Sequence, residues 1–123
     1  MKTLLIAFGL ILASTQLASA QTMTATNNTG VTWVVFPIYY DTGCNIDCET
    51  GFYVGAGSTA NSPAACGALL TEVYAKPSSG CSGYAKIAVP VPSCSSFPIT
   101  VSYSCNGNNY NLTWNGAYNL VIN

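Results

Sequence analysis

The sequence predicts an all-β fold, a small disulfide-stapled β-sandwich of about eight short antiparallel strands. Apolar residues occur in short runs or alternate with polar ones, and clusters of Gly, Pro, Asn and Ser interrupt them every ten or so residues. No stretch shows sustained helical periodicity, which is typical of a sandwich or barrel. The six cysteines would add the covalent staples that a domain of this size often needs.

The start of the chain has the pattern of a secretory signal peptide, which we assign to residues 1–20. Lys2 gives a positive start, residues 4–13 form a continuous apolar run, and Ala18 to Ala20 supply the small residues of a cleavage site. The apolar run is too short for a transmembrane anchor, which needs about 20 residues. We therefore expect residues 21–123 to form one secreted domain.

Eight segments have the composition of strands, because they are rich in β-branched and aromatic residues or alternate in polarity between turn residues. These segments are 22–26, 31–40, 52–54, 68–76, 84–89, 97–104, 110–114 and 118–122. The clearest hairpin joins the sixth and seventh segments, since Asn106, Gly107, Asn108 and Asn109 supply turn residues between them. Residues 41–51 and 55–63 are expected to be loops.

Residues 31–40 form the longest apolar run after the leader, as expected for a central strand buried on both faces. Pro37 lacks a backbone N–H, so it predicts a bulge or an edge position within this strand. In residues 68–76 two alternating sets of side chains compete for the core. The predicted core set is Leu69, Thr71, Val73 and Ala75.

All six cysteines follow the leader, and an even count behind a signal peptide predicts three disulfides. A strand separates Cys66 from Cys81, and another separates Cys94 from Cys105. Bridged Cα atoms lie within about 7 Å of each other, so these sequential pairings are disfavoured. With consecutive strands alternating in direction, the predicted bridges are Cys44–Cys48, Cys66–Cys94 and Cys81–Cys105.

Charged residues are scarce after the leader. The bases are Lys76 and Lys86, and the acids are Asp41, Asp47, Glu49 and Glu72. A nucleic-acid-binding protein needs a basic surface to neutralise phosphates, and attraction to anionic lipid needs one as well. Both functions are therefore excluded, and the surface is expected to consist of Ser, Thr, Asn, Gly and Tyr, which suits neutral extracellular partners.

Three of the four acidic residues fall within residues 41–49, beside Cys44 and Cys48. The candidate metal ligands in this loop are Asp41, Asn45, Asp47 and Glu49. Ca²⁺ takes six to eight oxygen ligands of this kind, although the spacing differs from that of an EF-hand loop. Two interpretations stay open: a Ca²⁺ site, or a solvated polar loop with Asx turns.

Aromatic and amide side chains gather near the C-terminus, where exposed rings could stack on sugars and amides could bind sugar hydroxyls. The candidate ligand-binding residues are Tyr110, Asn111, Trp114 and Asn119. The alternative is that Trp33 and Trp114 belong to the core and that the tyrosines are ordinary strand residues.

Catalysis is not expected. The chain has no His, so it lacks the usual base of a Ser–His or Cys–His nucleophile. We predict a secreted, non-catalytic binding module for carbohydrate or another neutral extracellular surface. One alternative is a structural or self-associating extracellular protein, which low charge favours and edge strands would allow. A further alternative is a membrane-active secreted protein, although no basic amphipathic segment supports it.

Overall fold

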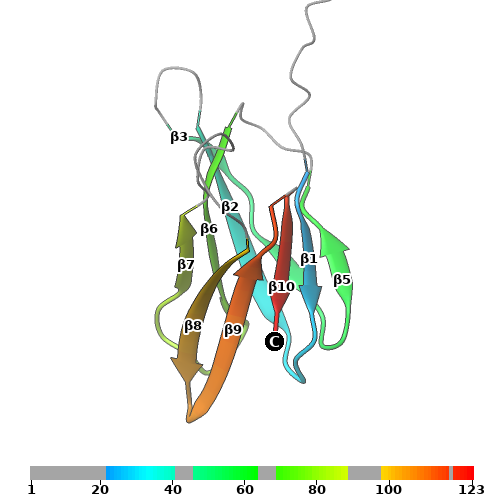
Figure 1. Cartoon of the computed structure of the whole chain (residues 1–123), viewed down its shortest axis with the longest axis vertical. Coiled ribbons are helices and arrows are strands. Elements are labelled where there is room, and N and C mark those ends of the chain that lie inside the picture. Colours follow the sequence, from blue (N-terminus) through cyan, green and yellow to red (C-terminus); the bar gives the residue numbers. More distant parts are fainter. Residues whose placement is uncertain (1–21, 41–45, 64–68, 89–97, 117) are drawn as a thin grey trace, which may run out of the picture.

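The computed structural model describes residues 22–40, 46–63, 69–88, 98–116 and 118–123. This part of the chain forms ten strands and no helix, and the strands make two sheets packed as a sandwich (Figure 1). The predicted all-β sandwich is confirmed. No helix in these residues is long and apolar enough to cross a membrane.

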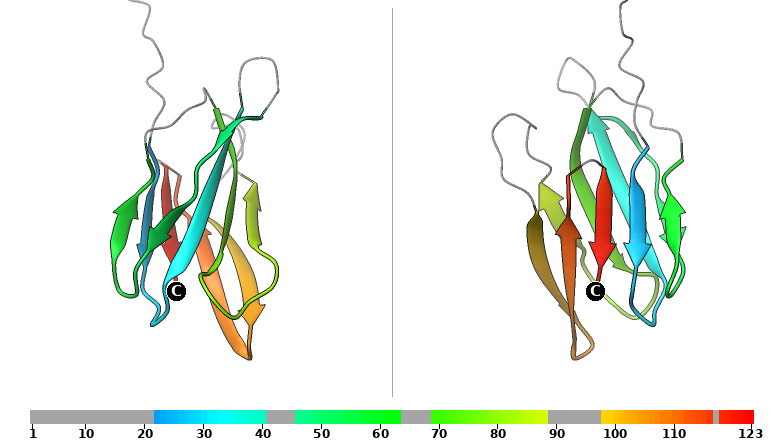
Figure 2. Two further views of the ribbon diagram at one scale, coloured as in Figure 1. Left: turned by 180° about the vertical axis from the view of Figure 1, so that it is seen from behind. Right: turned by 45° about the vertical axis from the view of Figure 1, so that its right-hand side comes forward.

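Sheet A has five strands in the order β5-β1-β10-β9-β8, side by side in the right-hand view of Figure 2. Their bounds are Thr59–Asn61 (β5), Thr24–Asn27 (β1), Asn119–Ile122 (β10), Asn108–Trp114 (β9) and Ile99–Cys105 (β8). Neighbours are antiparallel except β1 and β10, which are parallel. The prediction of antiparallel strands was wrong for this pair, because no hairpin connection fixes the relative direction of strands so distant in the sequence.

Sheet B is built around β2, which pairs with β6 on one side and with two short strands, β3 and β4, on the other. β7 pairs with the far side of β6. The bounds are Trp33–Tyr40 (β2), Ile46–Glu49 (β3), Phe52–Val54 (β4), Leu69–Pro77 (β6) and Ala85–Ala88 (β7). The left-hand view of Figure 2 shows the molecule from behind, with sheet B in front of sheet A.

β2 is the predicted central strand, and its side chains are buried on both faces. Trp33 and Val35 face the other sheet, while Val34 and Ile38 are also buried on the outer side. Pro37 lies between the segments that pair with β4 and β3, and the register shifts between Ile38 and Tyr39. Pro37 itself pairs in register with Val73, and the extra residue at the slip is on β6, so the bulge predicted at Pro37 is not found there. The alternative of an edge position fits better, because on the side of β3 and β4 the proline falls between the two paired segments.

Two strands lie where the sequence predicted loops. β3 pairs with Ile38–Tyr40, and β5 pairs with Thr24–Thr26. Their own composition, Ile-Asp-Cys-Glu and Thr-Ala-Asn, carries little strand propensity. Both become strands because a longer neighbour offers unpaired backbone groups, and such pairing outweighs intrinsic preference.

The inward side of β6 changes along the strand. Val73 and Ala75 are buried in the core as predicted, but Leu70 is buried there too. The register slip against β2 inserts one extra β6 residue between the partners of Ile38 and Tyr39. A bulge of this kind reverses the alternation of sides, which explains why Leu70 joins Val73 and Ala75 in the core. The side chains of the other two predicted core residues, Leu69 and Thr71, lie outside the described part of the structure.

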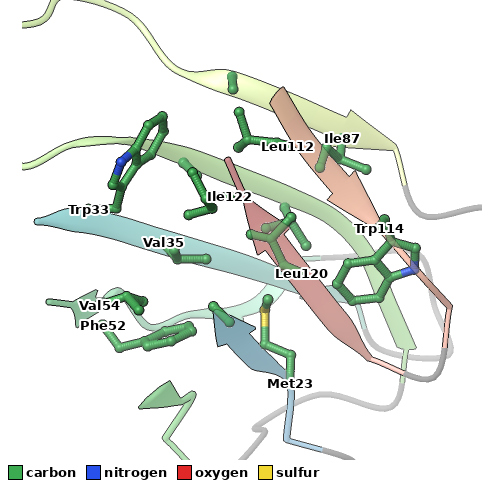
Figure 3. Packing of buried hydrophobic residues seen from close by; sticks show 14 of the residues in the cluster. Met23, Trp33, Val35, Phe52, Val54, Ile87, Leu112, Trp114, Leu120 and Ile122 are labelled. Carbon is green, nitrogen blue, oxygen red and sulfur yellow. The ribbon is translucent and has the colours of Figure 1, made fainter. Parts of the chain in front are cut away.

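The core fills the space between the sheets and includes both tryptophans. Figure 3 shows Trp33 and Trp114 at opposite ends of this core, with Val35 and Leu120 between them. Trp33 and Leu112 have no exposed surface. Side chains from the two sheets interdigitate in this way in sandwiches.

One polar side chain is enclosed at the end of the core. Asn27 has no exposed surface, and its Nδ2 lies 2.7, 3.1 and 2.9 Å from the carbonyl oxygens of Val31, Val54 and Gly55. Its Oδ1 accepts hydrogen bonds from the backbone N–H and the hydroxyl of Thr29. The Trp33 indole N–H donates in turn to Thr29 Oγ1 at 3.1 Å. Asn27 therefore ties the β1–β2 turn, the β4 end and the core tryptophan together.

Cys81 and Cys105 form a disulfide with Cα atoms 5.8 Å apart, as predicted. The predicted Cys44–Cys48 and Cys66–Cys94 bridges lie outside the described residues. The β8–β9 hairpin that carries Cys105 turns at Asn106 and Gly107, with φ of 51° and 78°. Positive φ at both positions is what an Asn-Gly hairpin turn supplies, so the turn predicted from the sequence is confirmed.

Candidate functional site

The four residues predicted to bind sugar are divided between the two sides of sheet A. Asn111 and Asn119 lie on the outer side, on neighbouring strands β9 and β10. Tyr110 and Trp114 alternate with the outward residues and therefore point inward. Residues that lie close together in the sequence are thus placed on opposite sides of the sheet by the alternation of strand side chains.

Trp114 is the clearest correction, because only 2% of its surface is exposed and it packs in the core. A ring in this position cannot stack on a sugar. Tyr110 is half-buried, and its ring centroid lies 5.1 Å from that of Trp33 in an edge-to-face contact. The alternative that placed Trp33 and Trp114 in the core is the correct one.

The predicted metal loop falls largely outside the described residues. Asp41 and Asn45 lie outside them, whereas Asp47 and Glu49 lie on β3, where the structure describes the backbone alone. In the parts of the chain that the structure describes, no three His, Cys, Asp or Glu residues form a group able to hold a metal ion. The Ca²⁺ site stays a prediction.

The structure instead gathers aromatic side chains on the outer side of sheet B. We call this surface the aromatic face and define it by four residues from β2, β4, β6 and the segment before β7. These residues are Phe36, Tyr53, Tyr74 and Tyr84. Tyr53 is 70% exposed and Tyr84 is 46% exposed. The two most exposed aromatic rings in the described residues are therefore on one side of the sandwich.

Edge-to-face contacts hold three of these rings together. The Tyr84 centroid lies 5.7 Å from that of Phe36 and 6.3 Å from that of Tyr74. Phe36 and Tyr74 are direct partners across β2 and β6. The Phe36 ring covers the backbone of Gly51 so closely that a Cβ at that position would collide with it. Contacts of this geometry fix the rings relative to one another.

All three charged side chains that the structure describes lie on the aromatic face. Lys86 Nζ is 2.7 Å from Glu72 Oε1, and the Tyr74 hydroxyl donates to Glu72 Oε2 at 3.0 Å. Lys76 Nζ lies 4.7 Å from the centre of the Tyr84 ring. The face therefore combines ring surfaces with hydroxyl, ammonium and carboxylate groups.

The ion pair between Glu72 and Lys86 shifts the pKa of each residue. The Lys86 ammonium, through its hydrogen bond, is the main cause of a lowered pKa for Glu72. The hydrogen bond to Glu72 is likewise the main cause of a raised pKa for Lys86. Glu72 thus stabilises the fold at pH above its unfolded pKa, and this contribution is lost as the pH falls through its folded pKa. Lys86 stabilises the fold below its unfolded pKa, and its contribution is lost as the pH rises through its folded pKa.

Glu72→Gln should therefore change the pH dependence of stability. We expect the variant to be slightly less stable than the wild type at neutral pH, because a partly exposed pair contributes little. The difference in stability should vanish at pH values below those at which glutamate ordinarily titrates, because the wild-type carboxylate is then neutral as well. Urea denaturation across acidic and neutral pH measures this. A difference that stayed constant with pH would assign the effect to packing and not to ionisation.

Sequence reasoning missed the aromatic face for a specific reason. Residues 31–40 are almost entirely apolar, so alternation could not show that Phe36 faces outward while Trp33 faces inward. The pairing of Phe36 with Tyr74, and of Tyr53 with Val34, depends on strand register. Each contact joins segments that are far apart in the chain.

Comparison of the chain with models of known protein families, with curated proteins and with solved structures finds no match.

Proposed function

We propose that this protein is a secreted, non-catalytic binding module that binds a neutral polysaccharide on its aromatic face. The observation that carries the proposal is the group of partly exposed rings, Phe36, Tyr74 and Tyr84, locked edge to face beside hydrogen-bonding groups. Sugar rings present C–H groups on one side and hydroxyls around the edge. A ring surface with adjacent polar groups complements both features.

The extent of the face supports a polymer as the ligand. Tyr53 lies beside Val34, Val34 pairs with Lys76, and Lys76 lies against Tyr84. Tyr53 and Tyr84 are thus separated by three strand spacings, or about 14 Å of sheet. A single sugar would not span that width, whereas an extended chain would contact both tyrosines at once.

The side chains around the rings can bind hydroxyls directly. The Tyr74 hydroxyl, the Lys86 ammonium and the Glu72 carboxylate form one hydrogen-bonded group. Together they offer donors and an acceptor, and the charges of Glu72 and Lys86 are paired with each other. A paired arrangement of this kind favours neutral hydroxylated partners over strongly charged ones.

Tyr84→Ala is expected to weaken polysaccharide binding about tenfold, which corresponds to a loss of roughly 1.4 kcal/mol. Tyr53→Ala should weaken binding to a long polymer more than to a short oligosaccharide, because only the polymer reaches both tyrosines. The measurement is affinity electrophoresis and calorimetry with glucan, xylan and mannan. Tyr84→Phe is the matched control and should retain binding, since the stacking surface is kept.

The variant Asn111→Ala distinguishes binding on the aromatic face from binding at the residues that the sequence predicted. This variant alters the outer side of sheet A and should bind polysaccharide as the wild type does. If Asn111→Ala lost binding while Tyr84→Ala bound normally, the ligand would lie on the outer side of sheet A, and the proposed aromatic face would be wrong. Absence of binding to every polymer in the panel would contradict the proposed function itself.

A further inference from the structure

The outer side of sheet A has a composition unlike the rest of the molecule. It consists of outward side chains from all five strands and the residues that directly follow β1 and β10. These side chains are Thr24, Thr26, Asn28, Thr59, Asn61, Thr100, Ser102, Ser104, Asn109, Asn111, Thr113, Asn119, Val121 and Asn123. We call this surface the ladder face. Every member except Val121 is a neutral hydroxyl or amide.

Side chains of the ladder face pair with one another across neighbouring strands. On β8 and β9, Thr100 hydrogen-bonds to Thr113 at 3.0 Å and Ser102 donates to Asn111 at 3.0 Å. The same pattern recurs elsewhere on the face. The further pairs are Ser104–Asn109, Thr24–Asn61, Thr26–Thr59 and Asn28–Asn123. Side-chain-to-side-chain bonds are a minority class in proteins, so six of them on one surface indicate a specialised face.

This pairing fixes the positions of the polar groups without exhausting their capacity to bind. A hydroxyl has one donor and two acceptor lone pairs, and an amide has four sites in all. A pair such as Thr100–Thr113 uses one donor and one acceptor, so further donors and acceptors remain for solvent. The rotamers are thereby held in place before any ligand arrives, which lowers the entropy lost on binding.

The sheet places these groups on a regular grid. Outward residues repeat at about 6.7 Å along a strand and about 4.8 Å between strands. Water oxygens on the prism planes of ice repeat at similar intervals in two directions. Because neighbouring strands rotate by about 20°, the match is best over the central strands β1, β10 and β9, which carry Thr26, Val121 and Thr113 side by side.

The absence of charge favours ordered water over other partners. In the described residues, the ladder face carries no Lys, Arg, Asp or Glu, and charged groups hold a hydration shell that does not fit a crystal. The face also has no exposed aromatic ring for a sugar. Its only fully apolar outward side chain is Val121, too little to hold a second copy, since stable interfaces have an apolar centre.

We infer that the ladder face binds the surface of ice. The hydroxyl and amide groups would hydrogen-bond to water molecules of the ice lattice. Val121 and the threonine methyl groups would lie over the spaces between those water molecules. This site is separate from the aromatic face, because the two are outer sides of opposite sheets (Figures 1 and 2). It does not depend on the proposed carbohydrate-binding function.

The test measures thermal hysteresis and inhibition of ice recrystallisation with the oxidised, purified protein. Asn111→Lys and Thr26→Lys each introduce a long charged side chain on the ladder face. Ala88→Lys is the matched control, because it adds the same group at an exposed position on β7 in sheet B. We expect activity in the wild type and in Ala88→Lys, and its loss in both ladder-face variants. Circular dichroism establishes that each variant is folded.

Three outcomes would overturn the inference. The first is a wild-type protein that neither shapes ice nor slows recrystallisation. The second is equal loss of activity in Ala88→Lys and Asn111→Lys, which would show that the ladder face is not the contact. The third is co-sedimentation with crystalline cellulose or chitin that Asn111→Lys abolishes, without any effect on ice; the ligand of this face would then be a polysaccharide surface.

Discussion

Replacing Asn27 with Ala should destabilise the protein by roughly 3–5 kcal/mol, because several buried polar groups lose their partners at once. The carbonyl oxygens of Val31, Val54 and Gly55 would lose the amide that lies 2.7–3.1 Å away. The Thr29 hydroxyl that binds the Trp33 indole would lose the nearer of its two acceptors. Asn27 itself has no exposed surface and its bond to the Val54 carbonyl oxygen is buried, so water could not replace that bond without opening the core.

Urea denaturation followed by tryptophan fluorescence measures this loss, and the signal is suitable because Trp33 is part of the network. Asn28→Ala is the matched control. Asn28 is exposed and donates one hydrogen bond to Asn123, so the change should stay within about 0.5 kcal/mol. Asn27→Asp should be at least as harmful as Asn27→Ala, since it removes the donor and buries a charge. An unchanged midpoint in Asn27→Ala would contradict the role of the network.

Trp114→Ala should cost the folded state roughly 3–5 kcal/mol, the usual price of removing a large buried aromatic side chain. Trp114 lies on β9 opposite Leu120 and Ile99 on the two neighbouring strands, and its ring contacts that of Tyr118. Its removal would open a cavity between the sheets that these neighbours cannot fill. Thermal unfolding, together with urea denaturation, gives the size of the effect.

Trp114→Phe separates a core role from a ligand-binding role. We expect this variant to be less stable than the wild type and to bind polysaccharide unchanged, because the aromatic face lies on the other sheet. Tyr53→Ala provides the reverse case: it removes a largely exposed ring, so stability should change little while binding falls. A Trp114→Phe protein of full stability that no longer binds polysaccharide would restore the assignment made from the sequence.

Local features of the chain were sufficient for much of the fold. Alternation in residues 97–104 and 110–114, with turn residues at 106–109 between them, predicted a hairpin that the structure confirms with strands at 99–105 and 108–114. The Cys81–Cys105 bridge followed from strand direction and reach alone. Each of these depends on neighbouring residues or on simple geometry, which a sequence contains directly.

Features that depend on pairing between distant segments required the tertiary structure. β3 and β5 are strands only because β2 and β1 offer them a partner, and the parallel β1–β10 pair joins the two ends of the described chain. The slip beside Ile38 reverses the inward side of β6. None of these follows from composition or period.

The candidate sites illustrate the same division. The sequence by itself determined that the protein has scarce charge, abundant hydroxyl and amide groups and strands with alternating sides. It did not determine which side of each strand meets the core. Alternation divides the residues of a strand between two sides, but it does not show which side is buried when both sides are aromatic or both are polar. Register decided that Trp114 is buried, that Phe36 and Tyr84 meet on one face, and that Asn111 belongs to the other.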